Sequence, residues 1–187
     1  MSKEAVYEKR IEITSECQVS LEGKTITVTG PKGTLQRSFP EPQTTIKIEG
    51  NEVIVGTHVS RKRARALVGT VIAHLRNMQL GVTLGYEYEM KIVYSHFPIT
   101  VEQQGNIMII KNFIGERGNR SANLIGDIDI RITEDEIFIS GINIEHVSQS
   151  AANIQQACRI RDKDRRVFMD GIYVIRKTKG EEVKSIV

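Results

Sequence analysis

The sequence predicts an α+β protein made of two similar domains from an internal duplication, each a small, mostly antiparallel sheet covered by one helix. Apolar residues alternate with a period of two through most of the chain, change to a helical period in two segments, and repeat this pattern 84 positions later. Hairpins with one covering helix per unit favour α+β over parallel βαβ winding. We therefore expect domains at residues 1–83 and 84–187.

The first half contains two predicted hairpins. One spans residues 19–28 with a turn at 22–24, and the other spans 46–55 with its tip at 49–51. The Gly-Pro-Lys-Gly stretch at 30–33 is a turn, because proline fixes φ and glycine tolerates positive φ. The alternating apolar positions are Val19, Leu21, Ile26, Val28, Ile46, Ile48, Val53 and Val55.

A helix follows these hairpins. Ser60 is expected to cap its N-terminus, and Gly81 is expected to close its C-terminus. Its predicted buried face consists of Ala64, Leu67, Val68, Val71, Leu75 and Met78.

The second half repeats this order. A strand is expected at 86–94, followed by a hairpin at 99–109 whose inward residues include Ile107 and Ile109. A second helix is expected to begin near Ser148. The second hairpin of the first half recurs as Ile130, Ile132, Ile137 and Ile139.

Composition excludes several classes of protein. With 40% apolar residues the chain can fill a core, so disorder is excluded, and no apolar window approaches the roughly 20 residues that a bilayer requires. Two cysteines form no disulfide framework or C-x-x-C pair, and the N-terminus has no apolar signal core. We expect a cytoplasmic protein with no membrane partner.

No enzyme motif is found in the sequence. The four histidines are far apart and fit no metal-binding spacing, and no P-loop, G-x-S-x-G or G-x-G-x-x-G is present. We therefore predict no catalytic residues, no cofactor, no metal and no small-molecule substrate. Asp127 and Asp129 share one strand face, where they are either solvated or, as a distant alternative, a hydrolytic pair. Residues 115–118 match the G-x-x-G of KH modules, although a turn between strands is favoured.

Charge is unevenly distributed although the net charge is only +3. Residues 159–180 hold eight basic and three acidic side chains, whereas 127–136 hold five acidic and one basic. Basic residues next to a glycine-containing segment suit phosphate and ribose contacts. The absence of Trp and the low aromatic content do not favour base stacking of the single-strand-binding kind, so a protein that recognises RNA shape and backbone is preferred.

A second basic cluster lies at the start of the first predicted helix. These cations occupy the turns where the helix dipole prefers acids, so they indicate either a site for an external phosphate or a solvated helix start. The cluster consists of Arg61, Lys62, Arg63 and Arg65.

Five segments together resemble a known family. They are Gly30–Leu35, Gly81–Tyr86, Tyr94–Ile99, Asn112–Glu116 and Asp170–Tyr173. In order and spacing they are similar to the large-subunit ribosomal protein family numbered six in the universal scheme, in its archaeal–eukaryotic form (eukaryotic number nine). The resemblance runs from about Cys17 to Tyr173.

The resemblance implies a non-enzymatic structural constituent of the large subunit. Its partners would be large-subunit rRNA, near the sarcin–ricin loop and the base of the factor-binding stalk, and neighbouring large-subunit proteins. The second domain would be the main rRNA-binding domain. The rRNA-binding residues so implied are Lys111, Asn112, Phe113, Gly115, Glu116, Arg117, Arg159, Arg161, Lys163, Arg165, Arg166, Gly171 and Tyr173. The alternative function is a β-rich protein–protein interaction module without RNA binding.

Overall fold

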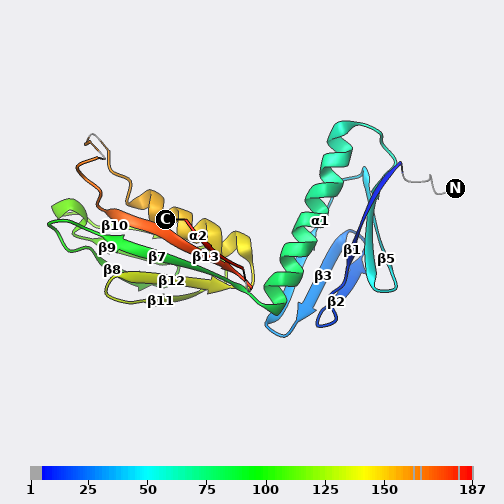
Figure 1. Cartoon of the computed structure of the whole chain (residues 1–187), viewed down its shortest axis with the longest axis horizontal. Coiled ribbons are helices and arrows are strands. Elements are labelled where there is room, and N and C mark those ends of the chain that lie inside the picture. The colour runs from blue at the N-terminus through cyan, green and yellow to red at the C-terminus, as the bar shows by residue number, and fades with distance from the viewer. Residues whose placement is uncertain (1–5, 162, 165, 181, 187) are drawn as a thin grey trace. The chain divides into compact units, whose positions relative to one another are not determined.

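The computed structural model describes residues 6–161, 163–164, 166–180 and 182–186. The chain divides into two compact units, Met1–Leu84 and Gly85–Val187 (Figure 1). Within the described residues each unit has antiparallel strands and one α-helix, which confirms the α+β class.

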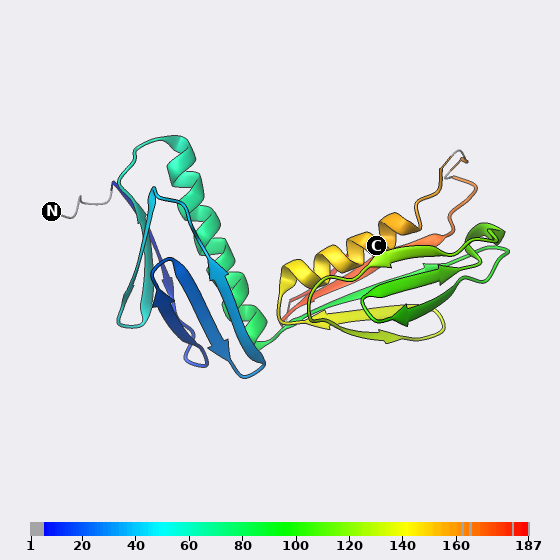
Figure 2. The ribbon, with the colours of Figure 1, turned by 180° about the vertical axis from the view of Figure 1, so that it is seen from behind.

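The first unit contains two three-stranded antiparallel sheets, with strand orders β1-β6-β5 and β2-β3-β4. Its helix packs against β1, β3 and β6. Figure 2 shows the ribbon of this unit from behind. The elements are β1 (Tyr7–Glu12), β2 (Gln18–Glu22), β3 (Thr25–Gly30), β4 (Gly33–Ser38), β5 (Thr44–Glu49), β6 (Glu52–Thr57) and α1 (Lys62–Thr83).

The second unit has a three-stranded sheet, β10-β9-β8, and a five-stranded sheet, β11-β12-β7-β13-β14. Its helix covers β7, β12 and β13 and also contacts β10. The elements are β7 (Tyr86–Val93), β8 (Thr100–Gln104), β9 (Ile107–Lys111), the 3-10 turn η1 (Phe113–Gly115), β10 (Arg120–Asn123), β11 (Asp129–Ile132), β12 (Glu136–Gly141), α2 (Ile144–Ala157), β13 (Gly171–Lys179) and β14 (Glu182–Ser185).

The internal duplication is visible in the strand pairing. The order β1-β6-β5 recurs as β7-β12-β11, and β2-β3-β4 recurs as β8-β9-β10. The cross-strand pair Ile46–Val55 recurs 84 positions later as Ile130–Ile139. The duplication is therefore confirmed at the level of individual residue pairs. Each copy builds two small sheets rather than one, and the second copy adds β13 and β14.

The predicted helix ends are wrong by a few residues. The N-cap position of α1 is Arg61, not Ser60, and its side chain makes no capping bond. Gly81 is buried inside the last turn, and the backbone takes positive φ only at Gly85. The α2 helix begins at Ile144, before Ser148, because the Asn143 side chain accepts a hydrogen bond from the backbone N–H of Glu145 at 2.9 Å.

The predicted inward face of the hairpin at 99–109 is also wrong. Met108 and Ile110 are fully buried, whereas Ile107 is 42% exposed. The two-residue turn at 105–106 pairs Val101 with Ile110. Since residues 107–110 are all apolar, alternation could not define the phase, and a shift of one residue exchanges the two faces.

The core of the first unit lies between α1 and the two sheets. Val68, Val71 and Leu75 are buried there, whereas the predicted core residue Leu67 is only partly buried. His74 is also partly buried, with its ring 6.1 Å from that of Phe39.

Leu75→Ala should therefore destabilise the first unit more than Leu67→Ala. The first substitution leaves a cavity and should cost about 2–4 kcal/mol, while the second removes a partly solvated side chain and should cost well under half of that. Urea titrations followed by circular dichroism measure both. Equal losses would contradict this placement of the helix.

Gly30 is where the turn between β3 and β4 touches the end of α1. A Cβ atom at this position would lie 2.7 Å from Val82 Cγ2 and 2.9 Å from the Val82 carbonyl oxygen. The next turn residue, Lys32, donates its backbone N–H to that same carbonyl at 2.8 Å and its ammonium to the Leu84 carbonyl. The absence of a side chain at Gly30 therefore permits the turn to satisfy the helix end.

Gly30→Ala should destabilise the first unit by about 1–3 kcal/mol, because backbone must move to admit the methyl group. Gly69→Ala in the middle of α1 is the matched control. Nothing lies within 4 Å of a Cβ there, and the helix gains propensity, so we expect stabilisation by about 0.5–1 kcal/mol. Opposite signs in thermal unfolding are the expected result.

Candidate nucleic-acid interface

Three loops converge at one end of the second unit, where β7 ends and β13 begins (Figures 1 and 2). They span residues 94–99, 112–119 and 158–170. The backbone N–H of Ser95 donates to Asp170 Oδ1 at 2.9 Å, which joins the first loop to the third. The side-chain amide of Asn112 donates to the Pro98 carbonyl at 3.1 Å, which joins the second to the first.

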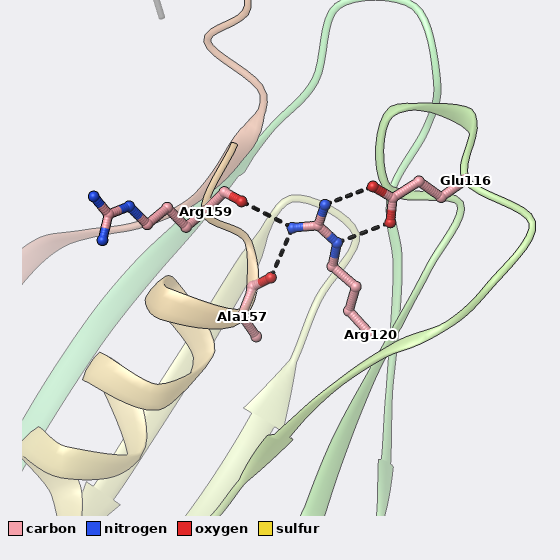
Figure 3. Close-up of polar contacts among 4 residues, drawn as sticks. All are labelled: Glu116, Arg120, Ala157 and Arg159. Atoms are coloured by element: carbon pink, nitrogen blue, oxygen red, sulfur yellow. Dashed lines mark hydrogen bonds and ion pairs between the residues drawn. The ribbon is translucent and has the colours of Figure 1, made fainter. Parts of the chain in front are cut away.

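Arg120, the first residue of β10, joins the second loop to the third (Figure 3). Its Nε and Nη2 donate to the two carboxylate oxygens of Glu116 at 2.9 and 2.5 Å. Its Nη1 donates to the carbonyl of Ala157, the last residue of α2, at 2.9 Å and to that of Arg159 at 3.1 Å. One guanidinium thus binds a carboxylate with one side and the helix C-terminus with the other.

The Phe113 ring packs against the guanidinium of Arg120. The ring is fully buried, and the Arg120 guanidinium carbon lies 4.1 Å from the ring centroid. The assignment of Phe113 to rRNA binding stays a prediction, and no part of its ring is exposed. The role of Phe113 is to hold the loop on the core.

The backbone of the second loop is strained. Asn112, Ile114 and Gly115 have φ of 58°, 53° and 71°. The left-handed conformation is costly for a β-branched residue such as Ile114. At Gly115 a Cβ would lie 3.0 Å from the ring of Phe97, so the glycine lets the first loop lie on the second. The buried Phe113 ring and the Arg120 bonds hold this conformation in place.

Electrostatics fix the charge state of the Glu116–Arg120 pair. The hydrogen bond from Arg120 lowers the pKa of Glu116, and the positive charge of Lys163 acts in the same direction. The same bond raises the pKa of Arg120. The nearby thiol of Cys158 has its pKa raised to about 12 by burial, so it is protonated and unreactive at neutral pH.

The remaining described basic residues of the second and third loops are exposed. Arg159 binds Arg120 only through its carbonyl, and Figure 3 shows its side chain directed away from the Glu116–Arg120 pair. Lys111, by contrast, forms an ion pair with Glu102 at 2.7 Å. Arg165 lies outside the described residues. The exposed cations are Arg117, Arg159, Arg161, Lys163 and Arg166.

Gly171 and Tyr173 lie at the beginning of β13. Gly171 is buried, and a Cβ there would meet the Tyr173 ring at 2.8 Å. The Tyr173 hydroxyl donates to the Met169 carbonyl at 3.2 Å, and the residue is 40% exposed. Gly171 therefore allows the ring of Tyr173 to lie over the backbone at the edge of the interface.

The acidic segment 127–136 belongs to β11, β12 and the turns beside them, on the side of β7 opposite to β13. The backbone N–H of Ile92 donates to the Asp135 carbonyl at 2.8 Å, and Ile92 pairs on its other side with Ile172 of β13. Asp127 and Asp129 are exposed, as expected for solvated carboxylates. No shared, desolvated carboxylate site exists there.

The other basic cluster belongs to the first unit. Arg61, Lys62, Arg63 and Arg65 are exposed at the start of α1, and the Arg65 guanidinium carbon lies 5.6 Å from the centroid of the Tyr7 ring. First-turn acids are absent from α1.

The described residues show no group of three or more His, Cys, Asp or Glu side chains placed to hold a metal ion. Nor does any helix in this part of the chain have the length and apolar character to span a membrane. Residues 115–118 join a 3-10 turn to a strand rather than two helices, so the KH interpretation of G-x-x-G is wrong.

Comparison with known proteins identifies the family. A model described as "Ribosomal protein L6" matches residues 13–85 and 97–171, one match in each unit. The chain belongs to the ribosomal protein L6 family. It is 46% identical over 178 residues to the large ribosomal subunit protein uL6 of Methanocella arvoryzae, covering 95% of this chain and 99% of that protein.

Two further archaeal relatives extend the comparison. The uL6 protein of Aeropyrum pernix is 42% identical, covering 93% of this chain and 96% of the relative, and that of Staphylothermus marinus is 46% identical, covering 90% and 93%. They confirm the archaeal–eukaryotic type. A ribosomal L6 protein is a structural, non-enzymatic component, so the hydrolase alternative is wrong.

Sequence interpretation missed the residues that organise the interface. Arg120, Phe97 and Asp170 bring the three loops together, although none was selected as a site residue. The spacing of Glu116 and Arg120, four residues apart, was a usable signal for an ion pair. The contacts of Arg120 with Ala157 and Arg159 span almost 40 residues and leave no mark in local sequence.

Arg120→Ala should destabilise the second unit by about 2–3 kcal/mol, because Glu116 and the carbonyls of Ala157 and Arg159 lose charge-assisted bonds. Arg120→Lys should restore little of this stability, since one ammonium cannot reach the carboxylate and both carbonyls at once. Thermal unfolding measures the loss.

Arg131→Ala is the control for this prediction. Arg131 is an exposed arginine of the same unit whose guanidinium carbon lies 4.4 Å from the centroid of the Phe138 ring. Its removal should cost no more than about 1 kcal/mol. Equal losses for the two arginines would show that Arg120 does not hold the loops together.

Proposed function

We propose that the chain is a structural constituent of the large ribosomal subunit and that its second unit is the main rRNA-binding domain. Membership in the L6 family and the printed names of the uL6 relatives support the first part. The family assignment also confirms the expected location on the cytoplasmic ribosome. The interface is formed by the loops at 112–119 and 158–170.

The observation that carries the proposal is the difference between the two copies. In the first unit, β3 and β4 are joined by the two-residue turn Pro31–Lys32. At the corresponding place the second unit has the loop 112–119, and after α2 it adds residues 158–170. The added segments meet at one end of the unit and carry the exposed cations. A part added to a duplicated scaffold, strained and rich in basic residues, is expected to serve binding rather than folding.

The chemistry suits a phosphate backbone. Guanidinium groups bind phosphate oxygens with two parallel hydrogen bonds, and lysine supplies a point charge. Glu116 is on the same surface, but its charge is neutralised by Arg120 and so repels phosphate less. The acidic residues 127–136 belong to β11, β12 and the turns beside them, and β7 lies between these strands and β13.

Within the subunit we propose contact with rRNA near the sarcin–ricin loop and the base of the factor-binding stalk, beside neighbouring large-subunit proteins. The similarity of Asn112–Glu116 and Asp170–Tyr173 to family motifs supports this position. The cluster Arg61, Lys62, Arg63 and Arg65 would make secondary contacts with phosphates.

The test is binding of the full chain to an rRNA fragment that contains the sarcin–ricin loop and the stalk base, over a series of salt concentrations. The double variant Arg159→Ala/Arg166→Ala should bind more weakly. Its log–log salt slope should be smaller by about 0.7–0.9 for each lost phosphate contact. The carbonyl of Arg159 remains, so the bond from Arg120 is kept.

The matched control is Asp127→Asn/Asp129→Asn, which changes two exposed charges of the same unit. We expect affinity and salt slope to stay within error of the unmodified chain. The proposed interface would be overturned if the arginine variant bound RNA like the unmodified chain while the aspartate variant changed affinity or salt slope. Hydroxyl-radical footprinting of the complex reports whether the protected nucleotides lie in the sarcin–ricin loop and stalk base.

A further inference from the structure

A hollow of about 320 Å³ opens between the C-terminal end of α2 and the start of β13. It lies beside the exposed cations of the third loop. Its volume is at the lower end of the range of small-ligand sites, about 300–1,000 Å³. Residues that line it include Gln155, Gln156, Arg159, Phe168, Gly171 and Tyr173.

Two aromatic rings form part of its wall. Tyr173 lies over Gly171, and its hydroxyl is bonded to the Met169 carbonyl, so the ring is held in one position. The backbone N–H of Phe168 donates to the Asp164 carbonyl at 2.9 Å. The ammonium of Lys163 lies 4.6 Å from the Phe168 ring centroid. The rings offer flat apolar surfaces next to positive charge.

The polar part of the wall consists of two amides and a guanidinium. Gln155 accepts a hydrogen bond from the backbone N–H of Val174 at 3.3 Å through its side-chain oxygen, which orients its amide. Gln156 supplies a second amide, and the side chain of Arg159 is exposed. Glutamine amides pair with the donor and acceptor groups on the edges of nucleobases.

We propose that this hollow binds a single unpaired nucleobase of the rRNA, with the base against Phe168 and Tyr173 and its phosphate near Arg159. The proposal rests on the proposed function and names the RNA feature recognised at the same interface. Proteins that bind RNA specifically contact bases that are free of pairing, through aromatic rings and hydrogen bonds to base edges. The low aromatic content argues against a multi-base stacking platform but is compatible with one base site.

The test uses the full chain bound to the rRNA fragment described above, probed with dimethyl sulfate and carbodiimide, which modify the edges of unpaired bases. With the unmodified chain, one reactive base should become protected. Phe168→Leu should abolish that protection and weaken binding by roughly fivefold or more, the loss of one base–aromatic stack. The salt slope should not change, because no cation is removed.

Tyr173→Phe and Tyr173→Leu are the matched pair. The first keeps the ring and should keep the protection, whereas the second removes the ring and should abolish it. Thermal unfolding of each variant shows whether the fold is intact, and Phe168→Leu decides the outcome if Tyr173→Leu unfolds.

The outcomes separate this inference from the proposed function. Salt-dependent binding with no protected unpaired base, or with protection that survives Phe168→Leu, overturns the base site and leaves the proposed function standing. Absence of any salt-dependent binding overturns both. Loss of protection in Phe168→Leu with an unchanged salt slope supports the base site. If the hollow instead binds a side chain of a neighbouring protein, no base is protected in this two-component complex, and the base site is overturned.

Discussion

The end of the second unit that carries the basic loops depends on one guanidinium group. Arg120 binds both oxygens of Glu116 and, from its other side, the carbonyls of Ala157 and Arg159. Helix ends leave carbonyls without partners inside the helix, and a cation placed there also complements the helix dipole. The same bonds hold the strained loop at 112–119 against the segment after α2. Folding and presentation of the basic side chains are thus coupled through a single residue.

In the first unit a lysine, not an arginine, binds the carbonyls at the helix C-terminus. There Lys32, in the turn between β3 and β4, donates its backbone N–H and its ammonium to the carbonyls of Val82 and Leu84 at the end of α1. In both copies a basic residue next to the turn of the small sheet satisfies the helix C-terminus. The duplicated scaffold therefore kept its internal connection, while the second copy lengthened the turn and extended the chain beyond the helix. The candidate interface is made of these additions.

Sequence periodicity predicted the repeated part of the fold well. Alternation is unambiguous at Ile46–Ile48 and at Ile130–Ile132, because one basic residue separates the two isoleucines in each strand, and the observed pairs match it. The prediction failed at residues 107–110, where every residue is apolar, and at the helix ends, where Asn143 rather than Ser148 supplies the cap. Charge patterning found the basic segment, but burial of Phe113 and the bonds of Arg120 arise from tertiary contacts that no local pattern contains.

Strand β13 has a consequence for how the protein is made. In the first unit β1 is an edge strand, and all strands of its sheet lie within residues 1–84. In the second unit β7 pairs with β13, and the loop before β13 supplies Asp170 to hold Ser95. Domains fold as units while the chain emerges from the N-terminus. The first unit can therefore fold early, whereas the basic end is assembled only after residues 171–179 have been synthesised. An incomplete chain would carry a folded first unit but an unfinished basic end, so the loops that bear the exposed cations come together only in chains whose synthesis is nearly complete.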